Sequence, residues 1–273
     1  GAVEAAASTG GQIMPPIMGA AAFLMTEYVN EPYGEIAVRA ILPAVLYFLG
    51  IFIAVHLEAK KSGLKGIPRS ELPRFSQLIK KVYLLAPLVI LVYLVTSNTN
   101  TIQVSASIAI IVAIVASLFD KDNRITPKRF FEAMAAGARG TITVAVACGI
   151  AGIIAGCITV TGLGSRLISA VINLSGGNVM IGLVLTMICC IILGMGVPTT
   201  ANYCIMAATC APILMDPSIG VEMMAAHFFV FYFGIVADIT PPVALAAYAG
   251  SAIAKSNPMK TGVQATKLAI GAF

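Results

Sequence analysis

Three short stretches place oxygen-bearing side chains next to helix-breaking residues inside apolar sequence. They read "AASTGGQIMPPIMG", "LGMGVPTTANYC" and "VADITPPVALAAYAG". In an apolar solvent, each broken helical turn frees backbone carbonyl and N–H groups that must pair with protein, a water-filled cavity or an ion. These three stretches are therefore where the chain is best equipped to bind an ion or a small polar molecule.

The middle stretch predicts a cation site. It joins three helix breakers to three side chains that carry oxygen: Gly194, Gly196, Pro198, Thr199, Thr200 and Asn202. Hydroxyl, amide and carbonyl oxygens suit a hard cation such as Na⁺. The half-helix that follows would present a positive partial charge at its N-terminus, which favours an anion nearby.

The other two stretches share one pattern of polar residues, a break, a Pro-Pro pair and alanines. The first contains Ser8, Thr9, Gly10, Gly11, Pro15 and Pro16, and the last contains Asp238, Thr240, Pro241 and Pro242. The segments "PPIMGAAAF" and "PPVALAAYAG" lie 226 residues apart. Prolines start helices well and end what precedes them, and an acidic residue within a membrane is usually functional. Paired, Pro-interrupted apolar segments indicate an inverted-repeat transporter site, although a lone Pro-Pro pair is often only a kink.

Composition indicates that the elements holding these stretches lie in a bilayer. The chain has 273 residues, of which 59% are apolar and 11% charged, and its mean hydropathy is +0.94. A soluble domain carries about a quarter charged residues. The net charge of +5 is confined to a few loops, which argues against a nucleic-acid partner.

Apolar runs long enough to cross a membrane, or nearly so, alternate with polar loops. The runs are Ile36–His56, Val82–Thr96, Val104–Phe119, Gly140–Val160 and Val179–Val197, followed by shorter ones at Thr199–Met215, Met223–Val236 and Pro241–Ala254. Glu132 and Arg139 are expected at the interface where the fourth run starts. Between Gly162 and Asn178, apolar residues at helical spacing predict an amphipathic interfacial helix.

Basic residues predict the orientation. One loop holds seven of them: Lys60, Lys61, Lys65, Arg69, Arg74, Lys80 and Lys81. The loop Asp120–Phe130 holds four more, whereas Ser97–Gln103 holds none. The positive-inside rule then places both basic loops in the cytoplasm and Ser97–Gln103 outside.

Enzyme chemistry finds little support in the sequence. His56 and His227 lack an acidic partner at ligand spacing, and the six cysteines lie in apolar segments without metal-binding spacing. No nucleotide-binding loop, nucleophile elbow or zinc-protease pattern is present. An intramembrane enzyme would need a catalytic partner for Asp238, so we expect no enzyme and no cofactor other than a coupling ion.

The motifs "STGGQIMPPIMGAAAFLM", "LGMGVPTTANYCIMAATCAPIL" and "GIVADITPPVALAAYAGSAIAKSNPMKTG" resemble the large membrane subunit of TRAP transporters, the tripartite ATP-independent periplasmic transporters. The likeness is to fused permeases that work with a TAXI-type periplasmic binding protein. The resemblance implies an all-α, polytopic transmembrane bundle with re-entrant hairpins and interrupted helices, built as an inverted-repeat elevator. It also implies Na⁺-driven uptake of carboxylates across the cytoplasmic (inner) membrane of a bacterium or archaeon.

Carried over by motif, the resemblance assigns roles to the residues of the three stretches. Substrate would be bound by Ser8, Thr9, Gly10, Gly11, Pro15, Pro16, Asn202, Thr240, Pro241 and Pro242, and Na⁺ by Gly194, Gly196, Thr199, Thr200, Asp238 and Thr240. Residues 1–35 would end the first transport hairpin, 36–135 would be scaffold helices, and 136–273 would form the second repeat. The first-repeat counterpart of "GMGVPTT" and a fused small subunit are expected upstream, so this fragment would not transport alone.

Two other functions stay open at this stage. An ion-coupled carboxylate symporter of similar architecture would need no binding protein. A membrane scaffold without transport activity would bind no Na⁺.

Overall fold

The computed structural model describes residues 1–273 except 65, 67, 69–78, 80–81, 98–99 and 120–123, and within the described residues it contains helices and no strand. The all-α class predicted from the sequence is thus confirmed. The chain divides into two compact units, which we describe separately. Unit 1 comprises Gly1–Glu31, Glu35–Glu58 and Thr143–Phe273, and unit 2 comprises Pro32–Gly34 and Ala59–Ile142.

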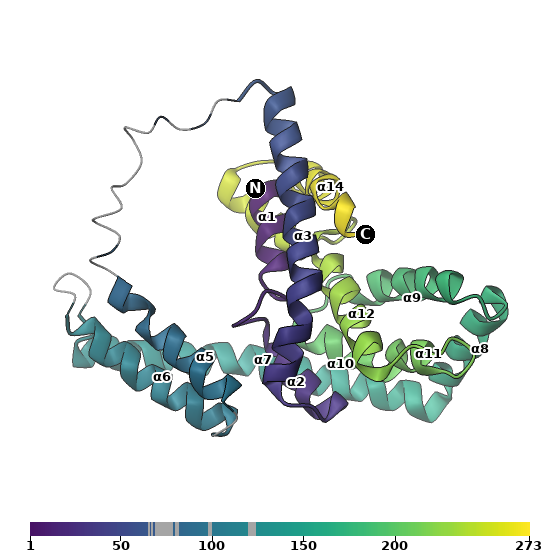
Figure 1. The fold of residues 1–273 in the computed structure, drawn as a ribbon, viewed down its shortest axis with the longest axis horizontal. Helices are drawn as coiled ribbons and strands as arrows, with labels where there is room; N and C mark the ends of the chain where they lie inside the picture. The colour runs from purple at the N-terminus through teal and green to yellow at the C-terminus, as the bar shows by residue number, and fades with distance from the viewer. Residues whose placement is uncertain (65, 67, 69–78, 80–81, 98–99, 120–123) are drawn as a thin grey trace. The chain divides into compact units, whose positions relative to one another are not determined.

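The helices of unit 1 are short and follow one another closely (Figure 1). They are α1 (Ala2–Gly10), α2 (Ala20–Val29), α8 (Leu163–Ser175), α9 (Val179–Gly194), α10 (Thr199–Thr209), α11 (Ala211–Met215), α12 (Met223–Val236), the 3₁₀ turn η3 (Ala237–Ile239), α13 (Leu245–Ala254), α14 (Pro258–Leu268) and η4 (Ile270–Ala272). Unit 2 contains η2 (Val82–Leu85), α5 (Ala86–Thr96) and α6 (Ile102–Ser117). Two long helices, α3 (Tyr33–Lys61) and α7 (Pro127–Thr161), contribute residues to both units.

Helix α3 is by itself long and apolar enough to cross a membrane. Its 29 residues span about 43 Å at 1.5 Å per residue. Glu35 lies in its first turn and Lys60 and Lys61 in its last, where these charges complement the helix dipole. Large apolar side chains such as Leu42 and Phe52 remain exposed along it, as expected of a helix whose solvent is lipid.

A second crossing is possible where two helices meet at an angle. The segments Cys148–Thr161 and Leu163–Ser175 pass the same test as a pair, with a bend of 71° between them. Gly162 sits at the bend with a φ of +66°. The second segment is α8, the predicted amphipathic helix. The other apolar helices among the described residues are shorter, at 10–17 residues.

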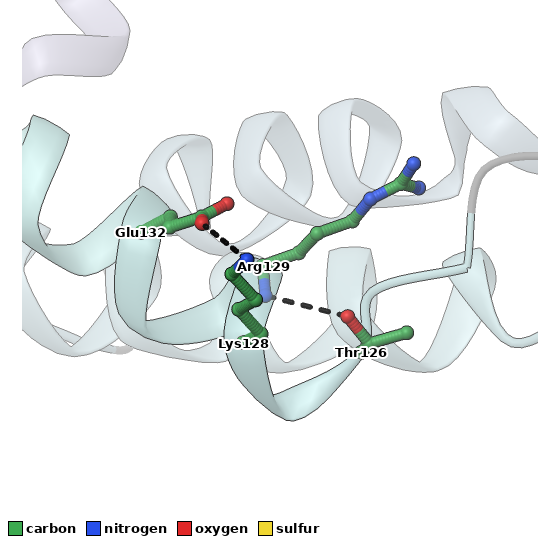
Figure 2. A network of polar contacts seen from close by, with 4 residues as sticks. All are labelled: Thr126, Lys128, Arg129 and Glu132. Atoms are coloured by element: carbon green, nitrogen blue, oxygen red, sulfur yellow. Dashed lines mark hydrogen bonds and ion pairs between the residues drawn. The ribbon is translucent and has the colours of Figure 1, made fainter.

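Helix α7 starts at Pro127, ahead of the apolar run predicted to begin at Gly140, and it includes Glu132 and Arg139. The predicted position of these two charged residues at the membrane interface stays a prediction. Figure 2 shows why it starts there: the Thr126 hydroxyl accepts a hydrogen bond of 3.3 Å from the backbone N–H of Arg129. Lys128 and Glu132 form an exposed pair one turn apart, at 4.0 Å. The Thr126 cap and proline at the first helical position thus set the start of the helix.

In unit 2, α5 packs against α6. The Thr101 side chain caps α6 by accepting a hydrogen bond from the backbone N–H of Val104. Several residues used for the orientation prediction lie outside the described part of the chain: Lys65, Arg69, Arg74, Lys80, Lys81, Asn98, Thr99 and residues 120–123. The orientation itself therefore stays a prediction.

The core of unit 1 is built around α12, which packs against α2, α9, α10 and α11. Figure 1 shows α10 and α11 beside it. Nine of the 14 residues of α12 are buried, among them Phe231 and Val230. His227 on α12 is buried, and its Nδ1 atom lies 2.8 Å from the hydroxyl oxygen of Tyr203 on α10. The structure therefore places this histidine in the core, in contact with the Tyr203 side chain.

Candidate functional site

The first predicted break becomes a tip between α1 and α2. Helix α1 ends at Gly10, and residues 11–19 form turns before α2 starts at Ala20. The backbone N–H of Met14 donates to the carbonyl of Gly11, and that of Met18 to the carbonyl of Met14. These local bonds satisfy part of the backbone where the helix stops. We call residues 11–19 the first tip.

The last predicted break has the same local structure. The N–H of Thr240 donates to the carbonyl of Ala237, and that of Ala244 to the carbonyl of Thr240. These pairs are those of the first tip shifted by 226 residues. Ala244 and its counterpart Met18 both have positive φ, and both Pro-Pro bonds are cis. We call residues 237–244 the second tip, and the internal repeat seen in the sequence is thus a repeat of backbone geometry.

The tips correct two expectations about helix boundaries. Pro241 and Pro242 do not start a helix, because the left-handed Ala244 intervenes and α13 begins only at Leu245. Ser8 and Thr9 do not lie in an open break but in the last turns of α1. Both corrections have a local cause: the positive φ of Ala244 delays the start of α13, and Ser8 and Thr9 stay in α1, where the Ser8 hydroxyl bonds Glu4 and Thr9 is buried.

The middle break is a short unwound segment between α9 and α10. Helix α9 ends at Gly194 and α10 begins at Thr199. Gly196 has a φ of +77°, a backbone conformation that residues other than glycine rarely adopt. A Cβ atom on Gly194 would lie 2.8 Å from the Cβ of Ala237. Glycine at residue 194 therefore lets this break pack directly against the second tip.

Two side-chain hydrogen bonds join the middle break to the end of α12. The Thr199 hydroxyl donates to Asp238 Oδ2 at 3.2 Å, and Asn202 Nδ2 donates to the carbonyl of Gly234 at 2.9 Å. Asp238 is thereby held beside the N-terminus of α10, where the partial positive charge of the helix end favours a carboxylate. The structure thus brings together Thr199, Asn202 and Asp238, which the sequence separates by up to 39 residues.

The first tip reaches the same carboxylate through a residue that we did not single out. The side-chain amide of Gln12 lies near Asp238, and α1 contacts η3. Gln12 stands inside the motif "STGGQIMPP", so a polar residue next to the glycine pair was the available signal. Asp238 consequently has neighbours from the first tip and from the middle break.

Several buried oxygens around these breaks lack a hydrogen-bond partner within the described residues. They are Asp238 Oδ1, Asn202 Oδ1, Thr9 Oγ1 and, on α9, Thr186 Oγ1. Asp238 is 8% exposed and Asn202 1%. A buried, unpaired oxygen is unfavourable unless water or an ion completes it. Asp238 Oδ1 and Asn202 Oδ1 are therefore buried acceptors without a partner in the described chain, next to the middle break and the end of α12.

Other predicted residues take different positions. Ser8 is exposed, and its hydroxyl donates to Glu4 Oε1 at 3.0 Å on the same helix. Gly10 packs against the ring of Tyr47, whose hydroxyl donates to the carbonyl of Ala6 at 2.8 Å. Thr240 uses its hydroxyl to satisfy the carbonyl of Val236 at 2.8 Å, which ends α12.

Beside the second tip, a recess of about 270 Å³ is lined by Pro241, Val263, Thr266, Lys267 and Ile270. The Thr266 hydroxyl donates to the carbonyl of Ile239 at 2.9 Å, so α14 is fixed to the tip. Lys267, which is exposed, brings a positive charge to this wall. Pro241, which the sequence predicts to bind substrate, thus lines an open recess beside the positively charged side chain of Lys267.

Comparison with known proteins places this arrangement in a family. Residues 1–271 match the family model described as "Tripartite ATP-independent periplasmic transporter, DctM component". No sequence match was found among curated proteins. The family match covers both tips and the middle break.

Proposed function

Because the chain belongs to the DctM component family of tripartite ATP-independent periplasmic (TRAP) transporters, we propose that it forms the permease part of a Na⁺-coupled uptake system for organic carboxylates. The family is a membrane transporter component and works with a periplasmic binding protein and a small membrane subunit. Na⁺, the carboxylate substrate, the TAXI type of binding protein, a small subunit fused upstream and a multi-pass inner-membrane location belong to the proposal.

The observation that carries the Na⁺ proposal is the buried Asp238 carboxylate with its unpaired oxygen. Thr199 and Asn202 add oxygen atoms at the junction between the middle break and the end of α12. One carboxylate balances one positive charge, so a monovalent cation leaves the junction neutral in a low-dielectric layer. Among the described residues, no three or more His, Cys, Asp or Glu side chains are grouped so that they could hold a metal ion.

The two matched tips support the carboxylate proposal. Substrate would lie between the first tip, with Pro15 and Pro16, and the second tip, with Thr240 to Pro242. Cation binding beside Asp238 would reduce the cost of carrying an organic anion through the membrane. Lys267 in the recess beside Pro241 adds a positive charge at the second tip. Bound Na⁺ would be the coupling ion, and we propose no other cofactor.

The test is uptake by the full-length permease, reconstituted in proteoliposomes with its binding protein. Labelled dicarboxylates and amino acids are offered under an inward Na⁺ gradient, and K⁺ replaces Na⁺ in the control. We expect uptake only with Na⁺ and only with the binding protein present. Uptake that persists in K⁺ would overturn the coupling, and uptake without the binding protein would favour the independent symporter.

Two variants test the ion ligands within the same assay. Thr200→Ala and Thr240→Ala each remove a hydroxyl that the proposal places at the Na⁺ site, and both should raise the Na⁺ concentration needed for half-maximal uptake. Thr141→Ala is the matched control, because its exposed hydroxyl serves only Gly137 on the same helix. Unchanged Na⁺ titrations in both test variants would remove these two residues from the site.

A further inference from the structure

A groove with a volume of about 460 Å³ lies between α3 and α12, within unit 1. Pro43 and Leu46 line one side, and Phe228, Phe229 and Tyr232 line the other. We propose that this groove binds one phospholipid with a zwitterionic, primary-amine head group, of the phosphatidylethanolamine class. The proposal does not depend on the transported substrate or on the coupling ion.

The groove runs along both helices away from one charged pair. Arg39 on α3 and Glu222 at the start of α12 approach to 3.6 Å and stand at its mouth. From there the lining continues at helical spacing, through Pro43 and Leu46 on α3 and to Phe233 on α12. The α12 wall extends about 16 Å from Glu222 to Phe233 and the α3 wall about 10 Å from Arg39 to Leu46, compared with about 15 Å for the hydrocarbon depth of one leaflet. A charged pair at one end and apolar side chains along the rest give the groove the polarity gradient of a lipid molecule.

The charged pair matches a zwitterionic head group. At 3.6 Å, with side chains 46% and 70% exposed, the Arg39–Glu222 pair is long and gains little by itself. A guanidinium group binds phosphate well, and a carboxylate accepts hydrogen bonds from a primary ammonium group. A phosphate and an ammonium group a few bonds apart would satisfy both side chains together.

The walls of the groove are prearranged and apolar. The rings of Phe229 and Phe233 stand 4.7 Å apart, those of Tyr232 and Phe233 5.2 Å, and Tyr232 also contacts Tyr47 of α3 at 6.0 Å between ring centroids. An acyl chain needs only such a surface. A protein helix bound in the groove would instead cover Arg39 and Glu222 without supplying a negative and a positive partner for them. Removing water from the Arg39–Glu222 pair would then be costly.

Tryptophan fluorescence provides the test, because the chain contains no Trp. Phe229→Trp places one reporter in the groove of the full-length protein, in which tryptophans outside this chain are replaced by Phe; Leu46→Trp is a second groove reporter should the first variant not fold. Leu42→Trp is the matched control on the exposed surface of α3. Each protein is reconstituted with brominated phosphatidylethanolamine, phosphatidylglycerol or phosphatidylcholine at equal mole fractions.

We expect phosphatidylethanolamine to quench the groove reporter most strongly, and all three lipids to quench the control reporter equally. Glu222→Gln should reduce the preference for phosphatidylethanolamine over phosphatidylglycerol by about fivefold, the size expected for the loss of one solvent-exposed charge pair. Glu132→Gln, an exposed glutamate outside the groove, should leave it unchanged. Equal quenching by all lipids would overturn the proposal, as would a groove reporter that no lipid quenches while the control is quenched, since protein would then cover the groove.

Discussion

Asp238 is the residue on which the proposed ion site depends most. Its carboxylate accepts from Thr199, lies near Gln12 and keeps one buried oxygen without a partner in the described chain. The sequence already marked Asp238, because an acidic residue beside a Pro-Pro pair in apolar surroundings is unusual. It did not mark Gln12, whose role is visible only once the first tip lies beside η3.

Asp238→Asn should weaken Na⁺ binding by about 10- to 150-fold, because a charged ligand at a buried site contributes about 1.5–3 kcal/mol. The measurement is the Na⁺ concentration that half-maximally raises the melting temperature of the purified protein, with K⁺ keeping the ionic strength constant. Asp216→Asn is the control, since Asp216 holds only the N–H of Ser218 in an exposed turn. If Na⁺ raised the melting temperature of the Asp238→Asn protein at the same concentrations as in the parent protein, the Asp238 carboxylate would be excluded as a ligand.

At the scale of elements, the middle break and the second tip act as one packed assembly. Gly194 sits where α9 ends, and added atoms there would meet both Ala237 and Asn202 at 2.8 Å. The Thr240 hydroxyl ends α12, and Thr266 fixes η3 to α14. The breaks are therefore held open by neighbouring elements and are not merely flexible joints.

Gly194→Ala should separate the break from the tip and lower the free energy of unfolding by about 1–3 kcal/mol, the usual cost of overpacking. Gly152→Ala serves as the matched control: it lies within α7 with no atom within 4 Å of an added Cβ, so it should be neutral or stabilising by up to about 1 kcal/mol. Thermal unfolding of both variants in the same detergent measures the difference. Equal stability of the two variants would contradict the close packing at Gly194.

At the scale of the whole molecule, the chain is a helical membrane protein with a repeated tip. The backbone bonds of the second tip repeat those of the first 226 residues later. One described helix is long enough to cross a membrane alone, and a bent pair offers a second crossing. A transporter bundle with interrupted helices requires short helices joined by turns whose backbone polar groups are hydrogen-bonded.

The predicted orientation can be tested with two introduced cysteines, one after the end of α3 and one in the first turn of α6. Ser62→Cys, next to Lys60 and Lys61, should react with a membrane-impermeant maleimide only after the cells are permeabilised, whereas Gln103→Cys should react in intact cells. The expectation follows from the positive-inside rule, and both positions are exposed. The unmodified protein shows the background from its native cysteines. Labelling of both introduced cysteines from the same side in intact cells would contradict the orientation.

The sequence by itself determined the membrane class, the three interrupted stretches and their family, because hydropathy and helix-breaking residues act locally along the chain. It misplaced the start of α13, where the left-handed Ala244 sets the boundary, and it did not indicate the Thr126 cap at which α7 begins. Only the tertiary structure decided that Thr199 bonds Asp238 and that Gln12 approaches the same carboxylate. The reason is physical: a local pattern fixes where a helix stops, but the partner of each freed polar group is chosen by the packing of distant segments.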